Sequence, residues 1–251
     1  MVSEGGRVES IAALLRSRGR AVAFTGAGIS TDSGIPDFRG RQGLWKRFDP
    51  RMATRSFMLE DPRAFWEFYA MRFESLARAE PNVGHRALAA LEKEGLLEAV
   101  ITQNIDGLHR KAGSRRVVEL HGNIGASRCD ECWSSRPTEE CVAVLRGKGE
   151  VPRCGCGGIF RPSVVLFEEP VEMFEAALGI AQESDLCVVV GSSLTVYPAA
   201  AIPEVVKSSG GSLVIINADP TPLDARADIV VREGASSALA GVVKALGINE
   251  G

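Results

Sequence analysis

The chain has 251 residues, of which 45% are hydrophobic and 24% charged, a composition typical of a globular protein with one large and one small domain. Its net charge of −3 gives no general attraction to nucleic acid, and no apolar run approaches the ~18 residues of a membrane span. The amino-terminal segment, with Glu4 and Glu9, lacks the apolar core of a secretory signal, so we expect a cytoplasmic protein. The sequence leaves the oligomeric state open, a monomer included.

Helices and buried strands alternate along most of the chain. A helical period comes first, through Val8, Ile11, Leu14 and Leu15. Solid apolar runs, typical of strands buried on both faces of a parallel sheet, follow at 21–24, 99–101, 164–167, 186–190 and 213–216. Helical stretches lie between or after them, near 84–94, 106–112, 171–183, 198–209 and 234–247. The pattern predicts an α/β fold with a doubly wound, parallel, Rossmann-like sheet.

Two segments interrupt this alternation and predict a small inserted domain. One is aromatic and helical, from about 53 to 79, and the other carries the cysteines, from about 123 to 161. The predicted Rossmann-like domain comprises residues 1–45, 80–122 and 162–251. The small domain combines a helical module, 46–79, with a zinc-binding module, 123–161.

A glycine-rich turn follows the first predicted strand. Gly26-Ala27-Gly28 lets the backbone turn tightly and approach a bound pyrophosphate closely. The hydroxyl and carboxylate side chains at 30–33 can cap the start of a helix, whose free N–H groups attract anions. Residues 36–40 then place an acid, an aromatic ring and a cation at the end of the loop, which indicates a binding site as well as a turn.

Polar side chains also follow three later strands. They lie at 102–106, at 191–194 and at 217–219. Ligands of parallel sheets bind at the carboxyl ends of the strands. Each stretch alone also fits an ordinary turn, but four strand ends of this character together predict a dinucleotide pocket.

Four of the six cysteines form two close pairs. Cys129 and Cys132 make a C-x-x-C, and Cys154 and Cys156 make a C-x-C further along the chain. In a chain expected to lie in a reducing compartment, this pattern predicts metal before disulfides. Four thiolates suit one closed tetrahedral Zn²⁺ site, which holds structure and does no chemistry. The alternatives are four ordinary cysteines or a redox pair.

His121 follows the predicted strand 117–120. A lone histidine is usually structural, but at a strand end facing the pocket an imidazole near its free pKa could take a proton at neutral pH. His85 and His109 lie within helical stretches, where a structural role suits them better.

Taken together and in this order, the motifs resemble the sirtuins, a family of NAD-dependent protein deacylases, from about residue 20 to 235. The resemblance is specific because it joins several separate stretches, which are Gly26-Ala27-Gly28-Ile29-Ser30 through Gly40, Thr102-Gln103-Asn104-Ile105-Asp106, His121-Gly122, the four cysteines, Arg161-Pro162 through Glu168, and Gly191-Ser192-Ser193-Leu194.

The resemblance implies NAD bound between a Rossmann domain and a small zinc domain, with an acyl-lysine entering from the opposite side. The acyl group moves to the ribose, which gives lysine, nicotinamide and O-acyl-ADP-ribose. His121 would be the general base on a ribose hydroxyl. Asn104 and Asp106 would orient the ribose, the carboxamide and an ordered water, and Phe38 would shield the reactive sugar from water.

The same resemblance assigns the NAD site. Ser192, Ser193 and Asn217 would hold the adenosine half, and Ala235 would contact adenine. The full set of implied cofactor-binding residues is Gly26, Ala27, Gly28, Ile29, Ser30, Thr31, Asp37, Phe38, Arg39, Trp45, Gln103, Asn104, Ile105, Asp106, Gly191, Ser192, Ser193, Asn217, Ala218, Asp219 and Ala235.

Val164, Val165 and Phe167 match the segment that the family pairs with its peptide substrate as an added strand. The family pattern is Val-Val-Trp-Phe-Gly-Glu, from which Leu166 and Glu168 depart. Glu168 would disfavour acidic peptides or favour basic ones. The expected partner is an acyl-lysine peptide or protein, with no membrane and no direct nucleic-acid partner.

Tyr69 and Arg72 lie three residues apart, on one face of a predicted helix. In an apolar pocket such a pair could bind a carboxylate through charge-assisted hydrogen bonds. Spacing alone favours an aromatic core stripe with an exposed arginine. The pair also resembles the sirtuin branch that removes succinyl and malonyl groups, which implies desuccinylation or demalonylation beside deacetylation.

Two other functions remain open from the sequence. One is a protein ADP-ribosyltransferase, which would share the NAD site and use another acceptor. The other is a non-catalytic NAD or nucleic-acid binding module with the cysteines in a zinc ribbon. The basic residues around the cysteines alternate with acids, which gives that ribbon only part of the expected charge.

Overall fold

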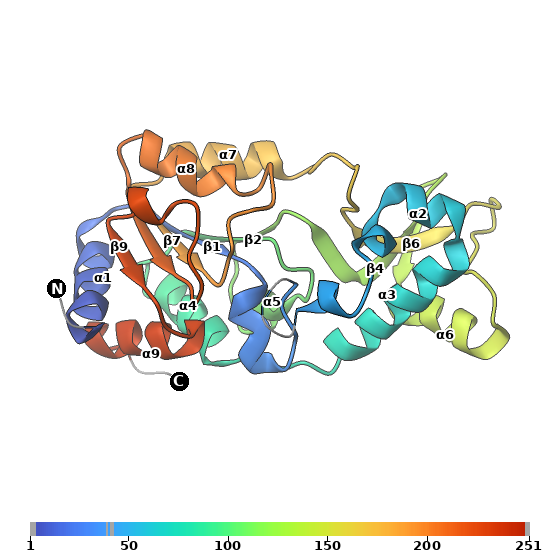
Figure 1. Ribbon diagram of the computed structural model, residues 1–251, viewed down its shortest axis with the longest axis horizontal. Helices are drawn as coiled ribbons and strands as arrows, with labels where there is room; N and C mark the ends of the chain where they lie inside the picture. Colours follow the sequence, from blue (N-terminus) through green and yellow to red (C-terminus); the bar gives the residue numbers. More distant parts are fainter. Residues whose placement is uncertain (1–3, 39, 41–42, 249–251) are drawn as a thin grey trace.

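Two sheets organise the protein, whose computed structural model describes residues 4–38, 40 and 43–248 (Figure 1). The larger sheet is parallel, in the order β3-β2-β1-β7-β8-β9, with β1 (Ala21–Thr25), β2 (Ala99–Thr102), β3 (Val117–Glu119), β7 (Leu186–Val190), β8 (Ser212–Ile216) and β9 (Ile229–Val231). The smaller sheet is antiparallel, in the order β5-β4-β6, with β4 (Gly122–Cys129), β5 (Ser135–Pro137) and β6 (Phe160–Val164). The predicted α/β fold with a doubly wound parallel sheet is confirmed.

Helices cover both faces of the larger sheet, and together they form the larger part of the molecule. One face packs against α1 (Glu4–Ser17), α4 (Val83–Lys93) and α9 (Ala235–Leu246). The other packs against α7 (Phe174–Gln182) and α8 (Ala201–Ser208). The connections include α5 (Leu108–Lys111) and the 3₁₀ helices η1 (Ala27–Ser33) and η4 (Asp224–Arg226). None of the helices in the described ranges has the length and hydropathy to cross a bilayer.

The smaller part of the molecule has its own hydrophobic core. Its helices are α2 (Arg55–Glu60), α3 (Pro62–Leu76) and α6 (Thr138–Lys148), preceded by the 3₁₀ helices η2 (Leu44–Lys46) and η3 (Pro50–Ala53). Asp61 caps α3 by accepting from Ala64 N at 3.0 Å, and Pro62 opens the first turn. The buried Trp66 donates from Nε1 to Phe160 O at 2.7 Å and so joins α3 to β6.

The apolar run 164–167 is not a strand of the parallel sheet, and that prediction is wrong. β6 ends at Val164 and pairs antiparallel with β4. Val164 and Leu166 are buried in the core of the smaller part, while Phe167 forms an isolated bridge with Thr54. An apolar run indicates that a segment is buried, but it does not indicate against which sheet the segment packs.

Two further elements differ from the sequence pattern. β9 has three residues and lies at the edge of the sheet, too short to show as an apolar run. The predicted capping of a helix at 30–33 is wrong, because these residues lie inside η1 and Gly26 stands at its N-cap position. Ser30 Oγ donates to Asp106 Oδ2 instead, at 2.8 Å.

Candidate active site

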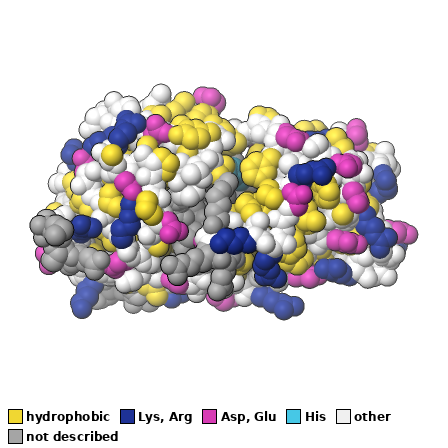
Figure 2. All heavy atoms as spheres, in the orientation of Figure 1, with side chains coloured by type: hydrophobic (Ala, Val, Ile, Leu, Met, Phe, Trp, Pro, Cys, Tyr) yellow, Lys and Arg dark blue, Asp and Glu magenta, His cyan; other side chains and the backbone are white. Residues whose placement is uncertain are grey.

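A cavity of about 480 Å³ lies where the carboxyl ends of the parallel strands face the smaller part. Figure 2 shows hydrophobic side chains gathered where the two parts of the molecule meet. Most of the predicted site residues line this cavity, namely Gly26, Ala27, Gly28, Ser30, Asp37, Phe38, Trp45, Tyr69, Arg72, Gln103, Asn104, Ile105, Asp106, His121, Val164, Val165, Phe167, Gly191, Ser192, Ser193, Asn217 and Asp219.

Some predicted cofactor residues do not line the cavity. Ile29 is fully buried in the core beside the sheet, and Ala235 is buried at the start of α9. Thr31 and Ala218 are exposed away from it. Arg39 lies outside the described residues.

The glycine turn after β1 packs directly on the turn after β7. Gly28 N donates to Gly191 O at 2.8 Å. Gly191 has a φ of 62°, and a Cβ there would lie 2.3 Å from Ile29 N, so only glycine fits. Ala27 begins η1, and its N–H donates to no acceptor within the described residues. This N–H, and the glycine backbone on either side of it, which carries no side chains, suit the close approach of an anionic group such as a pyrophosphate.

A hydrogen-bonded group of polar side chains forms the floor of the cavity. Asn104, only 8% exposed, donates from Nδ2 to Ser30 Oγ and to Gly26 O, both at 3.1 Å. Asp106 accepts from Ser30 Oγ and from Leu108 N, at 2.8 and 2.9 Å. These bonds fix both side chains while Asn104 Oδ1 keeps no partner among the described residues, so it can accept a hydrogen bond from a ligand.

Two buried histidines lie directly behind this group. His85 Nε2 is 3.4 Å from Ser30 Oγ, and His109 Nε2 is 2.9 Å from Thr25 Oγ1. Their ring centroids are 4.9 Å apart. Burial lowers the pKa of His85 to about 4 and that of His109 to about 3, so both are neutral at physiological pH. Their burial agrees with the structural role predicted for them.

His121 lies where the chain crosses from the larger to the smaller sheet, between β3 and β4. Its Nδ1 is 3.0 Å from Gln103 O, and because a carbonyl only accepts, Nδ1 carries the proton. In the neutral ring Nε2 therefore holds the free lone pair. Burial lowers the pKa of His121, against a smaller opposing effect of that hydrogen bond. The imidazole is consequently an unprotonated base at neutral pH.

Tyr69 and Arg72 of α3 are 5% and 9% exposed, so the exposed arginine of the alternative prediction is wrong. The Arg72 guanidinium carbon lies 5.1 Å from the centroid of the Phe38 ring. Within the described ranges, Arg72 makes no hydrogen bond and no ion pair. Burial lowers the pKa of its guanidinium. A cation held over an aromatic face without a direct ion pair can bind an anionic group.

Residues 164–168 leave part of their backbone unpaired beside the cavity. Val165 N donates to His121 O at 2.9 Å, and Phe167 exchanges bonds with Ala53 and Arg55. The carbonyl of Val165 and the N–H of Glu168 have no partner in the described chain. Free groups of this kind on an extended segment suit the addition of a peptide strand.

Glu168 adopts a φ of 79°, a conformation that favours glycine. Its carboxylate accepts from Ser56 N and Ser56 Oγ, both at 2.9 Å. The two bonds hold this strained residue against the start of α2.

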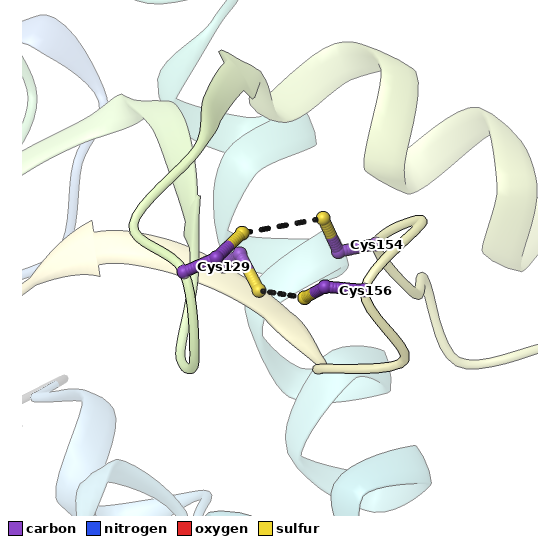
Figure 3. A group of neighbouring side chains, drawn as sticks. Cys129, Cys154 and Cys156 are labelled. Carbon is purple, nitrogen blue, oxygen red and sulfur yellow. Dashed lines mark hydrogen bonds between the residues drawn. The ribbon is translucent and has the colours of Figure 1, made fainter.

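The four cysteine sulfurs lie within 4.8 Å of one another. Figure 3 shows Cys129, at the end of β4, facing Cys154 and Cys156 of the loop between α6 and β6. The Cys129–Cys156 and Cys132–Cys154 sulfur distances are 3.5 and 3.6 Å, close to the about 3.8 Å that tetrahedral Zn–S geometry requires. The cluster fits a structural zinc ion, and four thiolates leave no position open for a substrate.

Several cavity residues escape the sequence reasoning. Phe68 and Leu76 lie four residues either side of Arg72, so helical spacing could have found them. Glu169 matches the last residue of the family pattern that begins at Val164, whereas Tyr197 carries no such signal, because its approach to the cavity depends on how distant loops meet. The lining residues that the sequence reasoning did not single out include Ile35, Phe68, Leu76, Val171, Val196, Tyr197 and Pro198.

Comparison with known proteins agrees with these features. The profile of the Sir2 family matches residues 26–198. A protein of Sulfolobus acidocaldarius named NAD-dependent protein deacetylase is 56% identical over 226 residues, 90% of this chain and 89% of that protein. One of Aeropyrum pernix named NAD-dependent protein deacylase is 48% identical over 245 residues, 96% of this chain and 98% of that protein.

A solved structure gives the same result. It is described as a Sir2 protein with a deacetylated p53 peptide and 3′-O-acetyl ADP ribose, and it matches with a TM-score of 0.92 and 39% identity over 96% of this chain and 99% of that chain. The predicted resemblance to the sirtuins is confirmed. Because the family profile spans most of the sequence and its relatives span nearly all of it, this chain belongs to the Sir2 family.

Proposed function

We propose that this protein uses NAD to remove acyl groups from lysine side chains, releasing nicotinamide, lysine and O-acyl-ADP-ribose. The observation that carries the proposal is one cavity that joins an unprotonated imidazole, a fixed polar floor and a segment with unpaired backbone. Family membership supports it, as do relatives named NAD-dependent deacetylase and deacylase.

The residues at the strand ends fit NAD. The N–H of Ala27 and the glycine backbone beside it would hold the pyrophosphate, while Ser192, Ser193 and Asn217 would hold the adenosine half. Asn104 and Asp106 would orient the nicotinamide ribose and the carboxamide. Bound NAD supplies the ribose carbon that accepts the acyl oxygen as nicotinamide leaves.

His121 provides the base for this chemistry. Its Nδ1–H donates to Gln103 O, which fixes the ring and leaves Nε2 free to take a proton from a ribose hydroxyl. The lowered pKa keeps Nε2 unprotonated at neutral pH. Phe38, which packs on Trp45 with ring centroids 5.2 Å apart, would exclude water from the reacting sugar.

The peptide would pair with residues 164–168, here called the peptide-binding segment. The Val165 carbonyl and the Glu168 N–H can accept and donate to a peptide backbone, which gives affinity with little dependence on sequence. The Glu168 carboxylate, exposed and held by Ser56, adds a negative charge at the edge of this segment, which favours basic peptides.

Tyr69 and Arg72 extend the proposal to acidic acyl groups. Arg72 is buried, lines the cavity and makes no direct ion pair within the described residues, although the Asp106 carboxylate acts on it at longer range, and Tyr69 lies one turn before it on the same helix. A succinyl or malonyl carboxylate would supply the missing negative charge. An acetyl group is smaller and neutral, so it would bind without this contact.

The reaction itself is tested by mass spectrometry of products formed from NAD and acetyl, succinyl or malonyl lysine peptides. Free lysine peptide and O-acyl-ADP-ribose are expected only when NAD is present. An ADP-ribosylated protein as the main product would instead favour a transferase, and unchanged NAD would favour a binding module.

The acyl preference is tested by Arg72→Met. Removing the guanidinium should lower kcat/KM for a succinyl peptide by at least about tenfold, because a charge-assisted hydrogen bond is lost. Deacetylation of the same peptide sequence should change much less. The measurement is kcat/KM for the two peptides at saturating NAD.

A matched control on the same helix is Arg63→Met, since Arg63 is exposed and, among the residues that the structure describes, pairs only with Glu67. This control should leave both activities near wild type. Equal losses of deacetylation and desuccinylation in Arg72→Met would refute the assignment of the acyl pocket.

A further inference from the structure

A chain of charged side chains connects the cysteine cluster to the peptide-binding segment. At its centre is Arg161 of β6, whose side chain is only 3% exposed. Arg161 donates from Nε to Asp130 Oδ1 at 3.1 Å, from Nη2 to Glu169 Oε1 at 2.8 Å and from Nη1 to Val164 O at 3.0 Å. All three nitrogens of the guanidinium are therefore engaged, which fixes the plane of the group.

One end of this chain belongs to the zinc loop, residues 129–132. Asp130 lies between two of the cysteines that fit zinc, and its backbone N–H donates to Ile159 O at 2.9 Å. Both of its carboxylate oxygens also accept from Arg55 of α2. The position of Asp130 is thus tied to the fold of the zinc loop, and its carboxylate helps to hold the Arg161 guanidinium.

The other end holds the backbone of the peptide-binding segment. Glu169 Oε2 accepts from Leu166 N at 2.9 Å, while Arg161 donates to Val164 O. Arg55 contributes again, because its N–H donates to Phe167 O at 3.1 Å. These hydrogen bonds engage the backbone groups Val164 O, Leu166 N and Phe167 O. The Val165 carbonyl between them stays without a partner in the described chain and lies beside the cavity.

We propose that Asp130, Arg161 and Glu169 are positioning residues through which the zinc loop sets the geometry of the peptide-binding segment. The inference rests on the proposed function, because it requires that residues 164–168 bind the acylated peptide. Glu169 lines the cavity beside the peptide-binding segment, and none of the three residues contributes to the glycine turn or to the polar floor. Their effect therefore falls on peptide affinity and not on NAD affinity.

The test uses Glu169→Gln, which keeps the shape of the side chain and removes the charge facing Arg161. The KM for an acetyl-lysine peptide should rise about tenfold, since a buried charge-assisted bond is weakened. Binding of NAD, measured by calorimetry without peptide, should stay at the wild-type value. Direct binding of a fluorescent acetyl peptide to NAD-free protein should weaken by the same factor, and one zinc per chain should remain.

Glu172→Gln is the matched control. Glu172 pairs with Arg128 at 3.2 Å near the zinc loop, is mostly exposed, and has no hydrogen bond or ion pair with the peptide-binding segment in the described chain. Its peptide KM should equal that of the wild type. Asp130→Asn should raise the peptide KM in the same direction, and the double variant with Glu169→Gln should show less than the product of the two effects, because both act through Arg161.

Unchanged peptide affinity in Glu169→Gln, or an equal loss of NAD affinity or zinc, would overturn the inference. Multiplying effects in the double variant would also overturn it. Wild-type protein that binds no acylated peptide would overturn the proposed function, an outcome that is visible before any variant is compared.

Discussion

His121 combines two constraints that a free imidazole lacks. The carbonyl of Gln103 selects the tautomer with its proton on Nδ1, and burial lowers the pKa. Each constraint increases the fraction of molecules with a free lone pair on Nε2. In the sequence, the position of His121 after a predicted strand and the order of the motifs distinguish it from the two structural histidines, and the residue type does not.

His121→Ala should lower peptide-dependent consumption of NAD by about a hundredfold or more, the contribution expected of a general base. NAD affinity and zinc content should be retained, because the side chain holds no other described residue except Gln103. Product formation followed by mass spectrometry provides the measurement. A variant with full activity would contradict the assignment of the base.

At the scale of elements, a zinc ion bound by the four cysteines would replace packing that the short strands and loops around it cannot provide. β5 has three residues, and the loop 149–159 that carries Cys154 and Cys156 has no helix and no named strand. Metal binding contributes directly to folding where so little apolar surface is buried.

Cys132→Ser should therefore lose zinc and lower the melting temperature by an amount on the order of 10 °C. Metal analysis and thermal unfolding provide the measurements. Cys187→Ala is the control, since Cys187 is buried in β7 and lies outside the cluster, so this variant should keep one zinc per chain. Stoichiometric zinc in Cys132→Ser would show that the thiolate is not a ligand.

The elements that the sequence predicts best are the central strands. β1, β7 and β8 are buried along their whole length, so their apolar runs are continuous and easily recognised. Residues 164–167 have the same composition but are buried by the smaller part, which their pattern cannot reveal. η1 differs for another reason, because Ser30 bonds to Asp106, a partner that is distant in sequence.

For the site, the spacing of Tyr69 and Arg72 places them on one face but leaves open whether that face is buried. The answer depends on Phe38, which comes from a loop more than thirty residues earlier and lies under the Arg72 guanidinium. The glycine turn and the cysteine pairs are local in sequence, and the structure brings both sets together as predicted. Contacts such as Arg161 with Asp130 and Glu169 require the tertiary structure.

At the scale of the whole molecule, two buried histidines make stability depend on pH. The pKa of His109 in the folded protein is about 3 and that of His85 about 4, both below the 6.5 of an exposed histidine. Between these values the unfolded chain binds more protons than the folded protein. The contribution of these two histidines to the free energy of unfolding is therefore fully present above pH 6.5 and is lost progressively as the pH falls below that value.

From pH 7 to pH 5 each of these histidines should remove on the order of 2 kcal/mol of the free energy of unfolding. Replacing one by a group that does not titrate, in His109→Gln, should make this loss smaller than in the wild type. Denaturant unfolding at a series of pH values measures the slope. The same slope in both proteins would show that other groups control acid stability.

The crossing between the two sheets has a mechanical consequence. β3 ends at Glu119 and β4 begins at Gly122, whose φ is 74° and where a Cβ would lie 2.2 Å from Ser163 O. His121, the proton acceptor of the proposed reaction, thus lies in the short link that joins the two sheets. A ligand that bound between the two sheets and displaced this link would lengthen the hydrogen bond from His121 Nδ1 to Gln103 O or reorient the imidazole. Such a ligand would impair the proposed proton transfer without contacting His121 itself.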